Sequence, residues 1–117
     1  LQDLETNCDP LYLPTTFDNV FERTLEPGCA LGSSSCHAPE GAKGGLVFDA
    51  LDPDAAWTAL LEPLNTEPRV VAGDPACSPL VHRIVSDDSA FQMPPGTGLS
   101  APEWCAVVHW ILEGASR

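Results

Sequence analysis

Basic residues are scarce in this sequence, which has five Lys and Arg against 17 Asp and Glu and a formal net charge of −12. A surface this acidic repels the phosphates of nucleic acids and of anionic lipids, so we expect neither as a partner. The charge suits a basic protein partner, although a solvated acidic surface that only aids solubility is the simpler explanation.

Long apolar runs are also missing, and none approaches the roughly 20 residues that a transmembrane helix needs. Several catalytic motifs are absent too: there is no phosphate-binding loop, no HExxH zinc motif, and no nucleophile elbow around the serines at 33–35. These absences argue against nucleotide-dependent and hydrolytic chemistry.

Cysteine pairs at zinc-ligand spacing are absent as well, although the chain has five cysteines: Cys8, Cys29, Cys36, Cys77 and Cys105. Without a C-x2-4-C pair, a structural zinc site is not expected. So many cysteines favour an oxidising compartment, and the chain opens at Leu1, as a trimmed exported protein would. We therefore expect a periplasmic or extracellular location. Because the count is odd, at least one cysteine lies outside an intrachain disulfide.

The apolar pattern predicts an all-α fold of about four short helices joined by Pro- and Gly-rich loops. Residues 1–15 form an irregular lead-in, and residues 16–117 form one domain. Strand signals are weak and confined to Gly45–Phe48 and Arg69–Ala72. The expected helices cover 16–25, follow the Asp52 N-cap, follow Ser78-Pro79, and run from the Ser100/Glu103 capping box to Gly114.

The dipeptide Cys36-His37 suggests specific chemistry. Covalent haem attachment uses C-x-x-C-H, in which two thiols bond the haem and the adjacent histidine reaches the iron. Here the second cysteine and the histidine are present, but Ser33 occupies the first cysteine position, and Cys29 is the nearest upstream thiol. By itself, such a dipeptide is also what a disulfide cysteine beside a loop histidine would give.

The single methionine, Met93, favours the haem hypothesis, because methionine sulfur commonly binds c-type iron opposite the histidine. Its setting, Met-Pro-Pro-Gly, stiffens the backbone and would help to hold a weak thioether ligand. A core methionine more often lies on a helix face, whereas the segment 91–98 is too rich in Pro and Gly for a helix or a central strand.

The other two histidines carry less information. We expect His82 to be a surface or packing residue and His109 to lie solvated on the polar side of the last helix. A zinc or copper site that combines His37, His82 or His109 with a cysteine is conceivable, but no ligand spacing supports it.

Residues 17–115 contain a series of short motifs in a fixed order: Phe21, Cys36-His37, Gly44-Gly45-Leu46, Val71-Ala72-Gly73-Asp74-Pro75, Ser78-Pro79-Leu80, Met93-Pro94-Pro95 and Trp110-Ile111-Leu112-Glu113-Gly114-Ala115. Taken in order, these motifs resemble those of the cytochrome c-like domains abundant in planctomycetes and myxobacteria. The resemblance implies an all-α cytochrome c fold whose first and last helices cross beside the haem; Ser33 departs from the family pattern.

The function that this resemblance implies is one-electron transfer through one covalently attached haem c, with His37 and Met93 as iron ligands and Cys36 and Cys29 as candidate attachment residues. With both axial positions filled, we do not expect an enzyme. The alternative, favoured by Ser33, is a haemless, disulfide-stabilised module that binds or links other proteins. The expected apolar shell consists of Phe21, Leu46, Trp57, Leu80 and Trp104.

The five cysteines can be divided in two ways, and the sequence leaves both open. If Cys36 alone bonds the haem, four cysteines remain and can form two disulfides, which parity favours. Cys8–Cys105 is then one bridge if the terminal helices cross, and Cys29–Cys77 is left as the other. If Cys29 also bonds the haem, one of the remaining three cysteines lacks a partner.

Overall fold

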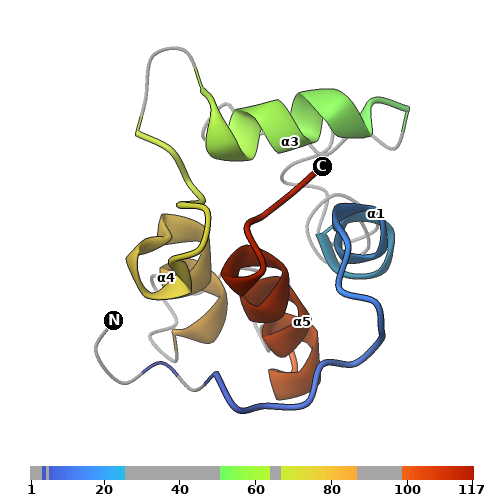
Figure 1. Cartoon of the computed structure of the whole chain (residues 1–117), viewed down its shortest axis with the longest axis vertical. Coiled ribbons are helices and arrows are strands. Elements are labelled where there is room, and N and C mark those ends of the chain that lie inside the picture. The colour runs from blue at the N-terminus through green and yellow to red at the C-terminus, as the bar shows by residue number, and fades with distance from the viewer. Residues whose placement is uncertain (1–3, 5, 26–50, 64–66, 87–98) are drawn as a thin grey trace.

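The fold was analysed in a computed structural model, which describes residues 4, 6–25, 51–63, 67–86 and 99–117. Each of the four predicted helices is present, and the described residues contain no strand, so the all-α prediction is confirmed. The central helix α5 lies between α4 and α1, and α3 crosses one end of the group (Figure 1). The elements are α1 (Phe17–Val20), η1 (Phe21–Leu25), α3 (Pro53–Leu61), η4 (Pro75–Cys77), α4 (Pro79–Val85) and α5 (Ala101–Leu112).

The first predicted helix is present but changes its winding halfway along. Thr16 caps it by accepting a hydrogen bond from the backbone N–H of Asn19 at 3.3 Å. After α1 the chain continues as the π-helical turn η1, a form that occurs mostly as single turns inserted in α-helices. The buried side of this composite helix matches the predicted apolar face: Phe17, Val20, Phe21, Thr24 and Leu25.

The caps of α3 and α5 behave as the sequence predicts, whereas Ser78 at the start of α4 makes no side-chain cap hydrogen bond. The side chain of Asp52 accepts a hydrogen bond from Ala55 N at 3.1 Å, which starts α3. At the start of α5, the Glu103 carboxylate accepts hydrogen bonds from the Ser100 backbone N–H at 3.0 Å and from its hydroxyl at 2.9 Å. Proline within the first turn of α3, α4 and α5 costs no helical hydrogen bond there.

The segment Arg69–Ala72 is not the strand that its sequence weakly suggested. Its backbone bonds instead to separate neighbours: the N–H groups of Arg69 and Val70 both donate to Leu60 O, at 2.9 and 3.0 Å. The fully buried Ser78 hydroxyl completes the turn by accepting from Val71 N at 2.8 Å and donating to Asp74 O at 2.9 Å. Local side-chain bonds of this kind satisfy the backbone here, since the described residues contain no strand that could pair with this segment. The other weak strand candidate, Gly45–Phe48, lies outside the described residues.

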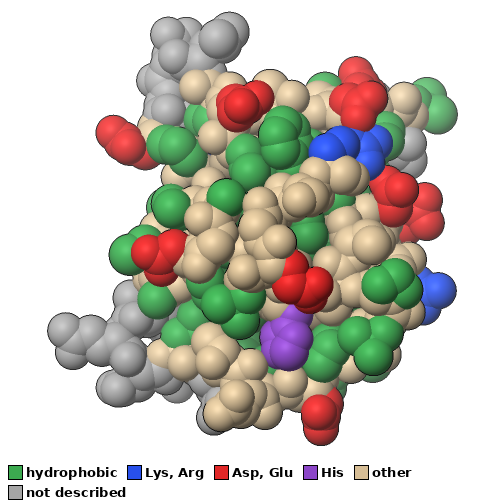
Figure 2. Space-filling view, viewed as in Figure 1, with side chains coloured by type: hydrophobic (Ala, Val, Ile, Leu, Met, Phe, Trp, Pro, Cys, Tyr) green, Lys and Arg blue, Asp and Glu red, His purple; other side chains and the backbone are tan. Residues whose placement is uncertain are grey.

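The lead-in packs onto the helices rather than standing apart from them. It passes the start of α5 (Figure 1), where Leu11 N donates to Pro102 O at 3.0 Å. Acidic side chains outnumber basic ones on the face shown in Figure 2, as the composition requires. Within the described parts of the chain, no helix has the length and apolar character needed to cross a membrane.

Candidate functional site

The four predicted haem-contacting residues all belong to two segments that lie outside the described residues. Cys29, Cys36 and His37 fall within 26–50, and Met93 falls within 87–98. The structure does describe the helices that flank these segments: η1 ends before the first, α3 and α4 lie between the two, and α5 follows the second. We call these helices the frame. The first segment follows Leu25, a fully buried residue, and the second is followed by Leu99, which packs against the core and leads directly into α5.

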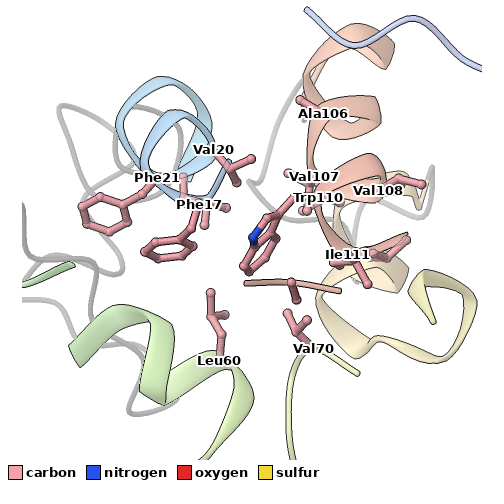
Figure 3. Packing of buried hydrophobic residues seen from close by; sticks show 14 of the residues in the cluster. Phe17, Val20, Phe21, Leu60, Val70, Ala106, Val107, Val108, Trp110 and Ile111 are labelled. Carbon is pink, nitrogen blue, oxygen red and sulfur yellow. The ribbon is translucent and has the colours of Figure 1, made fainter. Parts of the chain in front are cut away.

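The centre of this frame is an aromatic contact between the first and last helices. Phe17 is 1 % exposed, and its ring lies 5.3 Å from that of Trp110 and 5.6 Å from that of Phe21, measured between centroids. Figure 3 shows these rings converging between α1 and α5, with Leu60 of α3 beneath them. The predicted packing of the terminal helices is therefore confirmed.

The proposed apolar shell is largely part of this frame. Phe21 is buried, and Trp57, Leu80 and Trp104 are partly buried side chains packed against the core, whereas Leu46 lies outside the described residues. Trp57 does more than fill space, because its indole N–H donates to the backbone carbonyl of Ala115 at 2.9 Å. That bond fixes α3 against the end of the chain.

The last residues form a clasp that the sequence patterns did not reveal. Trp110 donates its indole N–H to Ser116 O at 2.9 Å, and Arg117 bonds the carboxylates of Asp18 and Asp54, at 2.8 and 2.5 Å. The turn that aims this tail uses Gly114 at φ 109°, a left-handed conformation that glycine adopts without strain. These bonds connect the end of the chain to α1, α3 and α5. In the sequence, only the Gly114-Ala115 motif indicated a turn at this position.

A hydroxyl pair is buried where the first helix ends. Tyr12 of the lead-in and Thr24 of η1 share a hydrogen bond, and Thr24 is almost fully buried. Burial raises the pKa of the Tyr12 phenol, outweighing the opposing effects of the Thr24 hydrogen bond and the nearby Arg23 charge. The phenol therefore stays protonated and ties the lead-in to the turn that precedes residue 26.

Both described histidines are held by backbone carbonyls. His82 bonds Ala76 O at 2.7 Å, and His109 bonds Thr6 O at 3.1 Å. His82 is half-buried, as befits the expected packing residue. The expectation that His109 is solvated is wrong: it is also half-buried, because the lead-in covers this side of α5.

The cysteines differ from the predicted pairing in one respect. The Cys8–Cys105 disulfide is confirmed, with a Cα–Cα separation of 6.0 Å. The Cys29–Cys77 bridge is wrong, because Cys77 is an exposed free thiol at the end of η4. A hydrogen bond to the Asp74 carboxylate, and the charge of that group, raise the pKa of this thiol. The parity argument for a single thioether therefore fails, since it required Cys77 as a partner for Cys29.

The residues of this chain fit a c-type haem by the chemistry of their donors. Cysteine thiols, one histidine and one methionine thioether occur in the two flanked segments, and these are the donor types that c-type haem uses. The described helices carry apolar and aromatic side chains, the kind that surround a haem. Among the described residues, the closest grouping of metal-binding side chains is Cys8, Cys105 and His109, and its sulfurs are bonded to each other.

Comparison with known proteins finds a matching family. The sequence model described as planctomycete cytochrome C matches residues 34–96, which is more than half of the chain. No curated protein and no solved structure matches it. The matched range encloses Cys36, His37 and Met93, and it includes helices α3 and α4.

Proposed function

Because the chain belongs to the planctomycete cytochrome c family, we propose that it transfers single electrons through one covalently attached haem, with His37 and Met93 as axial ligands. One observation carries the proposal. The family match begins two residues before Cys36 and ends three residues after Met93, so its limits coincide with the proposed ligand set.

In this proposal the haem supplies the iron whose oxidation state changes, and the chain supplies the ligands and the surroundings. With the His37 imidazole and the Met93 thioether as its two protein ligands, the iron would have no open position for a substrate, so we do not expect an enzyme. Trp57, Leu80 and Trp104 pack partly buried against the core and would limit the access of water to the haem. A lower local polarity stabilises the less charged, reduced state and raises the potential.

We propose that attachment uses Cys36 and also Cys29. With Cys8 bonded to Cys105 and Cys77 left as a thiol, these two are the remaining cysteines of the five. In an oxidising compartment they would otherwise bond to each other or remain reactive. Two thioethers would leave Cys77 as the unpaired cysteine, and the carboxylate of Asp74 raises the pKa of that thiol, which lowers its content of reactive thiolate.

The net charge of −12 supports a basic redox partner. The Cys8–Cys105 disulfide supports a periplasmic or extracellular location, because disulfides persist in oxidising compartments. Because this chain has few basic side chains to offset its acidic ones, attraction between opposite charges would drive its encounter with a basic partner. Association with the partner should therefore slow as ionic strength rises.

A haemless module is the second candidate, and Ser33 is the observation in its favour, because this residue replaces the first cysteine of C-x-x-C-H. The disulfide and the carboxy-terminal clasp would then hold the fold without a cofactor. In that case Cys29 and Cys36 would carry no haem, and the protein would serve as a binding or linking unit.

The ligand assignment is tested with Met93→Ala. Ferric haem with His and Met ligands has a weak sulfur-to-iron band at about 695 nm, which this substitution should abolish while the haem stays attached. Leu13→Ala is the matched control, because that side chain is 77 % exposed and its loss should leave the band intact. A haem protein whose band is present and indifferent to Met93 would overturn the assignment.

The attachment scheme is tested by proteolysis and mass spectrometry. We expect one haem-bearing product that contains both Cys29 and Cys36. A haem attached through Cys36 alone, with Cys29 recovered free or in another disulfide, would contradict two thioethers but not haem attachment itself.

A further inference from the structure

The disulfide at the start of α5 has a histidine beside it. The sulfurs of Cys8 and Cys105 and one ring nitrogen of His109 all lie within 4.8 Å of one another. Cys105 and His109 are four residues apart on α5 and therefore share one face of the helix. The lead-in brings Cys8 to that face. Cys105 is fully buried, while the other two residues are half-buried.

The hydrogen bond made by His109 fixes which of its nitrogens can bind a metal. The carbonyl of Thr6 can only accept, so His109 donates its Nε2–H across the 3.1 Å contact. The neutral ring then carries its lone pair on Nδ1. Metal-binding histidines commonly have this arrangement, in which one ring N–H is held by a backbone carbonyl and the other nitrogen is a ligand.

We propose that two-electron reduction of the Cys8–Cys105 disulfide by a dithiol creates a site for one thiophilic divalent metal ion, represented by Zn²⁺. The dithiol is oxidised to its disulfide, the protein S–S bond breaks, and each cysteine takes up one proton. Metal binding then releases those two protons, because thiolates are the ligands. In the oxidised protein the sulfurs are bonded to each other, and the site is closed.

The ligand set decides the class of metal. Two thiolates and an imidazole suit zinc, whereas magnesium and calcium prefer oxygen ligands. Two sulfurs on a tetrahedral zinc ion lie about 3.8 Å apart, given Zn–S bonds of roughly 2.3 Å. In the disulfide the sulfurs are bonded to each other, so reduction has to let them separate, while the His109 ring nitrogen already lies within 4.8 Å of both. Because three protein ligands leave a fourth position open, the site resembles an exchangeable or catalytic zinc site more than a closed structural one.

The test is zinc binding by the full-length protein, measured by equilibrium dialysis and elemental analysis. Cys77→Ser serves as the background, so that the exposed thiol contributes nothing. Reduction by a phosphine avoids the zinc affinity of dithiols and delivers the same two electrons. We expect one Zn²⁺ per reduced chain and none per oxidised chain.

Two histidine variants distinguish the loss of a metal ligand from a general loss of protein stability. His109→Ala should weaken zinc binding by at least about tenfold, as the loss of a ligand or its support does. His82→Ala is the matched control, because His82 also bonds a carbonyl but lies outside the cluster. Equal affinity in the two variants would overturn the proposal.

Circular dichroism keeps the test decisive if reduction destabilises the fold. A reduced chain that has lost helix should regain it when zinc is added, because binding is then coupled to folding. Failure of the reduced chain to bind zinc, whether folded or unfolded, would overturn the proposal. So would zinc retained by the Cys8→Ser/Cys105→Ser double variant, which would place the metal elsewhere.

Discussion

Truncating Phe17 to alanine should remove the contact that holds the terminal helices together. The side chain is 1 % exposed and lies within 5.6 Å of two other aromatic rings, so little water or mobile structure is available to fill the cavity. Truncation of a buried Phe costs about 3–5 kcal/mol. With one stacked and one tilted aromatic neighbour we expect a loss of about 4 kcal/mol, a large share of the roughly 5–15 kcal/mol that stabilises a typical domain.

Urea unfolding followed by circular dichroism measures this loss, in the same redox and cofactor state for both proteins. The transition should move to lower urea with an unchanged slope, and the melting temperature should fall by on the order of 15 °C. Leu13→Ala, on a side chain that is 77 % exposed, should change stability by less than about 0.5 kcal/mol. A loss below about 1 kcal/mol for Phe17→Ala would refute the account of the helix crossing.

Two further predictions concern the turn before α4. Ser78→Ala should cost about 1–3 kcal/mol in the same assay, because it leaves the Val71 amide without its 2.8 Å acceptor; a loss below about 0.5 kcal/mol would contradict this. Asp74→Asn should speed alkylation of Cys77 near pH 8, because the carboxylate that raises the pKa of this thiol is gone while the cap is kept; an unchanged rate would exclude that cause.

Helix positions could be predicted because their signals are local. Capping residues, proline at the first turn and apolar spacing act within a few residues, and Asp52 and the Ser100/Glu103 pair perform the expected roles. The Cys8–Cys105 bridge was predictable for a different reason, since it followed from the helix crossing that the family resemblance implied.

Long-range polar contacts could not be predicted in the same way. Nothing near Trp57 in the sequence indicates that its indole binds the carbonyl of Ala115, and Arg117 gives no local sign of its two acidic partners. The pairing of Cys77 failed because counting cysteines assumes that every thiol in an oxidising compartment finds a partner. Its exposed place at the end of η4, beside Asp74, is a property of the fold.

The candidate haem site was predicted from the chemistry of its residues together with the family resemblance, and it remains a prediction at the level of individual ligands. The residue types at Cys36, His37 and Met93 are informative because thioether attachment and axial ligation each require a specific donor. The family match covers the range that contains these three residues, whereas Ser33 alone would suggest a protein without haem.

The visible spectrum of the protein, purified from a host with haem-attachment machinery, tests the central claim most directly. We predict a Soret band whose absorbing group stays with the polypeptide after acid–acetone extraction, because the haem is covalently attached. Full-length, folded protein that shows no Soret band, or that loses its haem to the organic phase, would contradict the account.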